Sequence, residues 1–158
     1  MDSDIPNRLY WTKDAFKYNH SIFAGSEQVG VIKDASLNRS VKASLLGKNY
    51  VFEKSGFIKK KINVFDLTDR KEVGTIRFKS LSSKALITLF STEKSDRYLW
   101  KFKNSFSRRW MMFNHTGDLL LSGKSRKEGY AEYNTEKDGV LLLSALVIRN
   151  LFAMQGYG

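Results

Sequence analysis

The sequence predicts a mainly β protein, in which a closed antiparallel barrel of about twelve strands encloses a hydrophobic C-terminal helix. The first observation is that residues 140–154 are apolar on nearly every helical face, interrupted only by Ser144 and the Arg149-Asn150 pair. A helix that is apolar all round must be enclosed. Its apolar stretch before Arg149 is much shorter than the roughly 20 residues that a bilayer requires. We therefore expect the rest of the chain to enclose it.

The second observation is that short strand-like runs alternate with turn residues along the chain before this helix. Such spacing is typical of β-sandwiches and barrels. Turn signals such as Gly47-Lys48 and Thr116-Gly117 separate the runs. The predicted strands are Leu9–Trp11, Phe16–Phe23, Gln28–Lys33, Val41–Leu46, Asn49–Glu53, Ile58–Asp66, Glu72–Lys79, Ala85–Phe90, Tyr98–Lys103, Phe106–Asn114, Asp118–Ser122 and Gly129–Tyr133.

Alternation along these strands separates the inner face of the barrel from the outer face. Tyr98, Trp100 and Phe102 share one face, whereas Lys101 and Lys103 lie on the other. The apolar face is the one that must pack against an apolar helix. The lysines are therefore expected on the outside of the barrel.

The predicted helix, Val140–Met154, has suitable residues at both ends. The carboxylate of Asp138 can accept hydrogen bonds from free N–H groups of the first turn, and Gly156 is placed to end the helix. Pro6 is the single proline, so no proline-rich linker divides the chain. We expect residues 1–158 to form one domain, with residues 1–8 as a flexible leader.

An internal repeat at an offset of 48 residues supports the barrel. Tyr50–Phe52 matches Tyr98–Trp100, and Ile58–Asp66 matches Phe106–Asn114. Aromatic, basic and apolar positions keep their register between the two units. Repetition of one supersecondary unit indicates the same strand meander placed twice around the barrel.

Composition limits the classes of function. The chain has 27 Lys and Arg against 16 Asp and Glu, a net charge of +11, which favours anionic partners. It contains no cysteine, which excludes disulfides, thiolate metal sites and thiol catalysis. The N-terminus lacks an apolar run, so no secretory signal and no transmembrane segment are predicted. The expected location is cytoplasmic, with peripheral association at the membrane.

No group of residues points to catalysis, a cofactor or a metal. Gly123-Lys124-Ser125 resembles part of a phosphate-binding loop, but the upstream Gly117 is wrongly spaced and no helical pattern follows. The two histidines, His20 and His115, lack a second histidine at ligand spacing. We therefore expect a non-enzymatic protein without a cofactor.

The basic residues are the candidate site. Lysines and arginines held on one rigid sheet can bind phosphates through charge-assisted hydrogen bonds. The candidate anionic-ligand residues are Lys59, Lys61, Lys101, Lys103 and Arg109. Alternation places Arg108 on the side of Phe106 and Trp110, so Arg109 is the expected solvent-facing contact, with Lys61 as its counterpart in the first repeat.

The chain resembles the tubby C-terminal-like superfamily, which includes LURP-one-related proteins and phospholipid scramblases. The resemblance rests on the meander Tyr98–Lys103 leading into Phe106–Asn114, the turn and strand Gly117–Ser122, and the apolar helix that follows Asp138-Gly139. It implies a closed barrel of about twelve strands around the helix, and phosphoinositide head groups as ligands. The chain shows no carboxylate cluster like that implied for the calcium loop of scramblases.

Three functions are consistent with this sequence. The first is binding of anionic phospholipid or phosphoinositide head groups at a membrane surface. The second is a structural or protein-interaction domain, for which the partner would be another protein. Nucleic-acid binding ranks third: Tyr98, Trp100, Phe102 and Trp110 interleave with basic residues as stacking platforms do, but core packing explains the same aromatic residues.

Overall fold

The computed structural model describes residues 6–13, 19–34, 40–55, 61–79, 83–90, 95–103, 109–125, 128–133 and 138–154. These residues form twelve strands and one helix, as predicted. The elements are β1 (Arg8–Lys13), β2 (His20–Ala24), β3 (Glu27–Lys33), β4 (Ser40–Leu45), β5 (Lys48–Ser55), β6 (Lys61–Asp66), β7 (Lys71–Phe78), β8 (Lys84–Phe90), β9 (Ser95–Phe102), β10 (Arg109–Asn114), β11 (Leu119–Ser125), β12 (Glu128–Tyr133) and α1 (Gly139–Met154).

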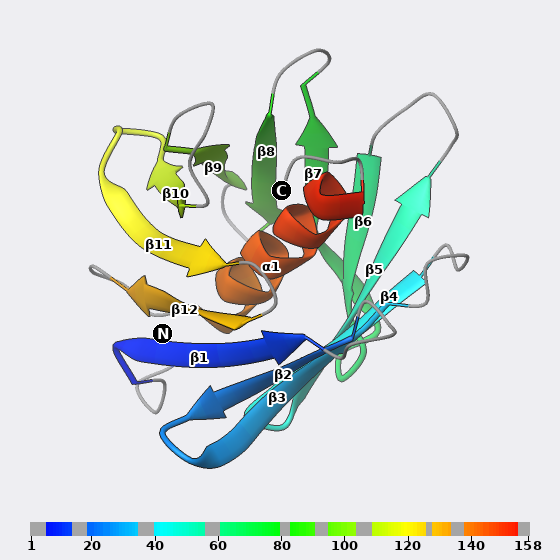
Figure 1. Ribbon diagram of the computed structural model, residues 1–158. Helices are drawn as coiled ribbons and strands as arrows, with labels where there is room; N and C mark the ends of the chain where they lie inside the picture. Colours follow the sequence, from blue (N-terminus) through cyan, green and yellow to red (C-terminus); the bar gives the residue numbers. More distant parts are fainter. Residues whose placement is uncertain are drawn as a thin grey trace.

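The strands form one closed antiparallel barrel (Figure 1). Each strand pairs with its neighbours in sequence, and β12 pairs with β1 to complete the ring. At this closure Leu9 lies opposite Ala131, and Trp11 lies opposite Gly129. Among the described strands, closure leaves no open sheet edge.

Helix α1 lies inside the ring of strands, as the sequence predicted (Figure 1). Its side chains from Val140 to Asn150 are all buried. The predicted cap is confirmed: the Val140 N–H donates to Asp138 Oδ1 at 3.0 Å, and the Leu142 N–H donates to the Asp138 carbonyl at 3.2 Å. The Tyr133 hydroxyl donates to the same carbonyl at 2.8 Å and so ties the start of the helix to β12.

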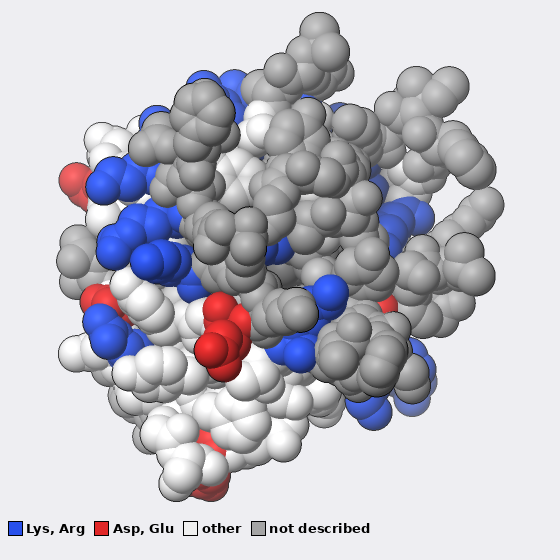
Figure 2. Space-filling view, viewed as in Figure 1, with Lys and Arg blue, Asp and Glu red and all other residues white. Residues whose placement is uncertain are grey.

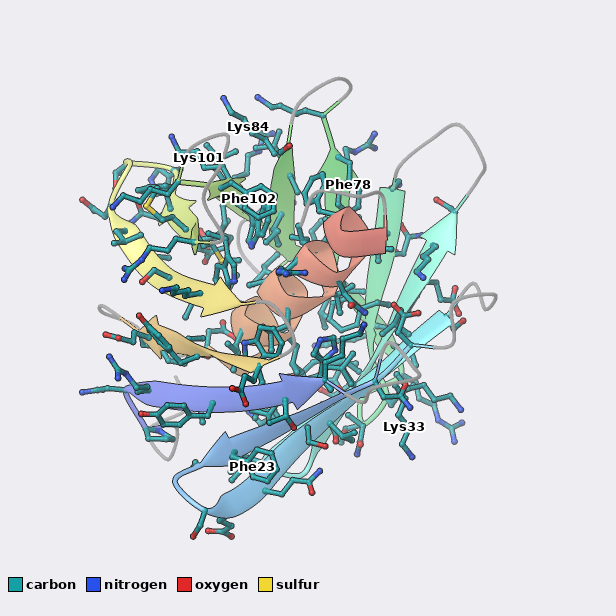
Figure 3. The ribbon with its side chains drawn as sticks, in the orientation of Figure 1. Phe23, Lys33, Phe78, Lys84, Lys101 and Phe102 are labelled. Carbon is teal, nitrogen blue, oxygen red and sulfur yellow. The ribbon has the colours of Figure 1, made fainter. Side chains whose placement is uncertain are left out.

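The predicted alternation sets the core of the barrel. Trp100 and Trp110 are fully buried and stack with ring centroids 6.2 Å apart. Trp100 also stacks on Phe152 of the helix at 5.2 Å. Phe78 and Phe102 point toward α1 and contact the same Phe152 ring, with centroids at 5.5 and 5.8 Å (Figure 3). Aromatic side chains from β7, β9 and β10 thus hold the end of the helix in place.

The repeat is visible in the register. Tyr50 lies opposite Asp66 in the β5–β6 pair, and Tyr98 lies opposite Asn114 in the β9–β10 pair, so both positions shift by the same 48 residues. The β6–β7 pair has a bulge in β7 opposite Val64 and Phe65, and the β10–β11 pair has one in β11 opposite Met112 and Phe113, again 48 residues apart. A third bulge lies in β3 opposite Ile22 and Phe23. The same irregularity therefore recurs every four strands around the ring.

Close strand packing explains two glycines near these bulges. A Cβ at Gly30 would lie 2.5 Å from the Ser44 carbonyl oxygen, and one at Gly74 would lie 2.5 Å from the Thr88 carbonyl oxygen. Backbone atoms cannot move aside as a flexible side chain can, so a larger residue would force the strands apart. Both positions therefore require glycine.

No helix in the described part of the chain has both the length and the apolar character needed to cross a bilayer.

Candidate anionic-ligand site

Three of the five predicted site residues lie together on the outside of the barrel. Lys101 and Lys103 are two residues apart at the end of β9 and therefore share a face. The Lys103 N–H donates to the Arg109 carbonyl at 2.9 Å, which places Arg109 beside Lys103. Lys103 and Arg109 are exposed, and Lys101 is half-buried with its Nζ 5.4 Å from the centroid of the Phe113 ring.

Basic residues on neighbouring strands extend this group. Lys84 of β8 lies opposite Lys101, and Lys124 of β11 lies opposite Arg109. Lys79, directly after β7, donates its N–H to the Lys84 carbonyl at 3.2 Å. We call these six residues the basic face: Lys79, Lys84, Lys101, Lys103, Arg109 and Lys124.

The figures show the same arrangement. In Figure 2, Lys and Arg side chains gather along the upper left of the molecule, over β8 to β11. In Figure 3, Lys84 and Lys101 point outward at this side, whereas Lys33 lies at the opposite, lower right. Lysine and arginine side chains occur elsewhere on the molecule, but the basic face places four of them on adjacent strands and two directly after a strand.

Of the other two predicted residues, Lys61 is described by the structure, and it does not join this group. Lys61 begins β6 and lies opposite Arg77 of β7. It is three strands from Lys101 of β9, or about 14 Å along the sheet at the usual spacing of strands. Lys59 lies outside the described residues, as does Arg108. Lys61 and Arg109 therefore occupy equivalent positions in the two repeats, but they lie on different parts of the ring.

Like charges directly oppose each other in the basic face. Lys84 faces Lys101 and Arg109 faces Lys124, and such pairs repel each other in a sheet. A cation with a carboxylate partner lies farther along the sheet, where Arg8 forms an ion pair with Glu132 of β12. The guanidinium carbon of Arg8 also lies 4.5 Å from the centroid of the Tyr130 ring. A multiply charged anion on the basic face would relieve the repulsion between its cations.

A second polar cluster, which the sequence did not predict, joins the helix to the barrel wall. Asp34 follows β3 and is 1% exposed. Its Oδ1 accepts a hydrogen bond from Lys54 Nζ of β5 at 3.2 Å, and its Oδ2 accepts one from Asn150 Nδ2 of α1 at 3.2 Å. The Asp34 N–H donates to Asn19 Oδ1 at 3.0 Å. The polar residue Asn150 in a mostly apolar helix was the available sequence signal for such a partner.

Burial raises the pKa of Asp34 above its ordinary value of 3.8, whereas the Lys54 ammonium and the hydrogen bonds from Lys54 and Asn150 lower it; the net shift is upward. The folded state therefore holds the proton of Asp34 more tightly than the unfolded state does. The protonated Asp34 carboxyl stabilises the folded state fully at a pH below the pKa that Asp34 has in the unfolded chain. This stabilisation is lost as the pH rises through the pKa that Asp34 has in the folded protein.

We expect Asp34→Asn to remove this dependence on pH. The free energy of unfolding of the unsubstituted protein should fall relative to that of Asp34→Asn as the pH rises from about 4 to 7, because the buried carboxylate must then carry its charge. Urea unfolding of both proteins at each pH measures the difference. A relative gain of stability by the unsubstituted protein over this range would show that the Lys54 ion pair outweighs burial.

The described residues give no support for a metal site. They contain no group of three or more His, Asp or Glu side chains placed to hold an ion. His20 is buried and packs edge-on against Trp11, with ring centroids 5.0 Å apart. His115 is exposed in the turn between β10 and β11. The two histidines thus occupy separate and different environments.

No model of a known protein family matches the chain, and no curated protein or solved structure matches it. The fold alone places the chain in a structural class: a closed twelve-stranded antiparallel barrel with a helix inside it.

Proposed function

We propose that this protein is a non-enzymatic module that binds anionic lipid head groups at a membrane surface through the basic face. The observation that supports the proposal is the placement of six basic side chains on, or directly after, adjacent strands of one sheet. A basic residue near an anionic membrane contributes about 1 kcal/mol, so four or five acting together would give measurable recruitment. A rigid sheet presents these cations without the entropy cost of ordering a loop.

The resemblance to the tubby C-terminal-like superfamily supports the same proposal. It implies phosphoinositides as the preferred head groups, which carry several phosphates and suit a surface with several cations. Charge-assisted hydrogen bonds from Lys103 and Arg109 would contact these phosphates, and Arg109 can bind one with two parallel hydrogen bonds. The location that follows is the cytoplasmic surface of a membrane.

Nucleic-acid binding receives less support from the structure. Base stacking needs exposed aromatic faces, and Trp100 and Trp110 are fully buried in the core. Tyr98 and Phe102 pack against the same core. Trp100, Trp110 and Phe102 are therefore on the inner side of the barrel, and Tyr98 packs against the core while it also lines a hollow with Lys101.

Sedimentation with vesicles tests the proposal. We expect the protein to pellet with vesicles that contain phosphatidylserine or a phosphoinositide and to stay in the supernatant with pure phosphatidylcholine. Binding should weaken as salt rises, because ions screen exposed charges beyond about 8–10 Å at ordinary ionic strength. Soluble inositol phosphates should compete if head groups alone are recognised.

Three outcomes would contradict the proposal. Equal sedimentation with neutral and anionic vesicles would show that the basic face does not drive binding. Failure to bind any vesicle, together with retention of a protein partner at high salt, would support the alternative of a protein-interaction domain. Stronger binding to single-stranded oligonucleotides with a steep dependence on salt would support nucleic acid instead.

A further inference from the structure

The outer side of the barrel carries an apolar hollow beside the basic face. Leu86 of β8 lies opposite Leu99 of β9, and Leu99 lies opposite Phe113 of β10, so the three side chains form one row across three strands. They line a hollow of about 540 Å³, which is within the range of roughly 300–1,000 Å³ for small-molecule sites. The Leu86 side chain is 38% exposed to water on this face, although it is apolar.

Cations lie on two sides of this row. Arg97 and Lys101 both line the hollow and flank Leu99 in β9 at two residues on either side, so all three side chains share the outer face. Lys84, opposite Lys101, continues directly into the basic face. The hollow thus has an apolar centre with basic residues beside it.

One carboxylate lies near the rim, and it is engaged locally. Asp118 follows Gly117, which lines the hollow. Its Oδ2 accepts hydrogen bonds from Thr116 Oγ1 at 2.9 Å and from Asn114 Nδ2 at 3.3 Å. These bonds are part of the turn between β10 and β11. Asp118 therefore has partners of its own at the edge of the hollow.

We infer that the row of Leu86, Leu99 and Phe113 enters the interfacial layer of an anionic bilayer when the basic face binds head groups. This inference rests on the proposed function and adds which surface of the barrel meets the membrane. Peripheral proteins bury apolar side chains about 5–10 Å into the boundary between head groups and acyl chains, with basic residues beside them. The hollow has this arrangement, because its apolar centre is flanked by Arg97 and Lys101. The acyl chains of a bilayer would contact the apolar centre while its phosphates contact the two cations.

A fluorescent label at a single cysteine tests the inference. The chain contains no cysteine, so Leu86→Cys creates one unique site for an environment-sensitive dye such as NBD. We expect the emission of this label to shift to the blue when phosphatidylserine vesicles are added, and to be quenched by brominated lipid. The matched control is Leu46→Cys in the β4–β5 turn, where Leu46 is similarly exposed at 41%. The emission of the control label should stay that of a dye in water.

The outcomes separate this inference from the proposed function. Sedimentation of the labelled Leu86→Cys protein without a blue shift would overturn insertion and leave lipid binding in place. Absence of sedimentation with the unlabelled, unsubstituted protein would overturn both. A blue shift before vesicles are added, growing with protein concentration, would mean that a second copy covers the hollow and would also overturn insertion.

Discussion

Leu143→Asp is expected to abolish cooperative folding of the domain. Leu143 lies in the second turn of α1 and is 0% exposed inside the barrel. An aspartate there would place an unpaired charge among apolar side chains, at a cost of several kcal/mol. Domains of this kind have a total stability of about 5–15 kcal/mol. Thermal unfolding followed by near-ultraviolet circular dichroism should show no cooperative transition at the temperature of the unsubstituted protein.

Leu67→Asp is the matched control for this prediction. It makes the same chemical change at an exposed turn position between β6 and β7, where Leu67 is 46% exposed. Its effect should stay within about 0.5 kcal/mol, as for most surface substitutions. An unchanged cooperative transition in Leu143→Asp would mean that the helix does not need its enclosure, and would contradict the principal stabilising role of the buried helix.

Hydrophobic pattern was sufficient to predict the architecture of this protein. A helix with apolar residues on nearly every face must be enclosed in water. Twelve strands that each alternate between apolar and polar residues can close into a barrel that encloses it. The bulges opposite Ile22, Val64 and Met112 could not be predicted, because one inserted residue changes the register without a distinctive residue type. The bulges set which strand residues face each other, so the detailed composition of the outer face had to come from the structure.

The candidate site was predictable only in part, for a related reason. Alternation correctly placed Lys101, Lys103 and Arg109 outside, because their neighbours Trp100 and Trp110 are large core residues. The repeat made Lys61 the counterpart of Arg109, and such equivalent positions lie four strands apart around the closed ring.

The cluster around Asp34 was beyond sequence reasoning. It joins the residue after β3 to Lys54 of β5 and Asn150 of α1, which is 116 residues away in the chain. Such a group depends on where a strand ends and on how deeply the helix enters the barrel. Local pattern carries little information on either quantity, although a polar residue within an apolar helix indicates that a partner must exist.

Reversal of two charges in the basic face is expected to abolish most of the lipid binding. Lys103→Glu combined with Arg109→Glu replaces two adjacent exposed cations, and the net charge falls from +11 to 11 − 4 = +7. Loss of two basic contacts at about 1 kcal/mol each predicts a decrease in vesicle affinity of roughly 30-fold, and repulsion by the new carboxylates adds to it. Stability should change little, because both side chains are exposed.

The most direct test compares this double variant with Lys33→Glu combined with Lys42→Glu in one titration with phosphatidylserine vesicles. Lys33 and Lys42 are also exposed and lie opposite each other in β3 and β4. These strands are six positions around the twelve-strand ring from β9 and β10, on the other side of the barrel. Both variants have the same net charge. Our proposal predicts a large loss of affinity for the Lys103 and Arg109 variant and near-normal affinity for the Lys33 and Lys42 variant. Equal losses, or a larger loss for the Lys33 and Lys42 variant, would contradict the proposal that the basic face binds the membrane.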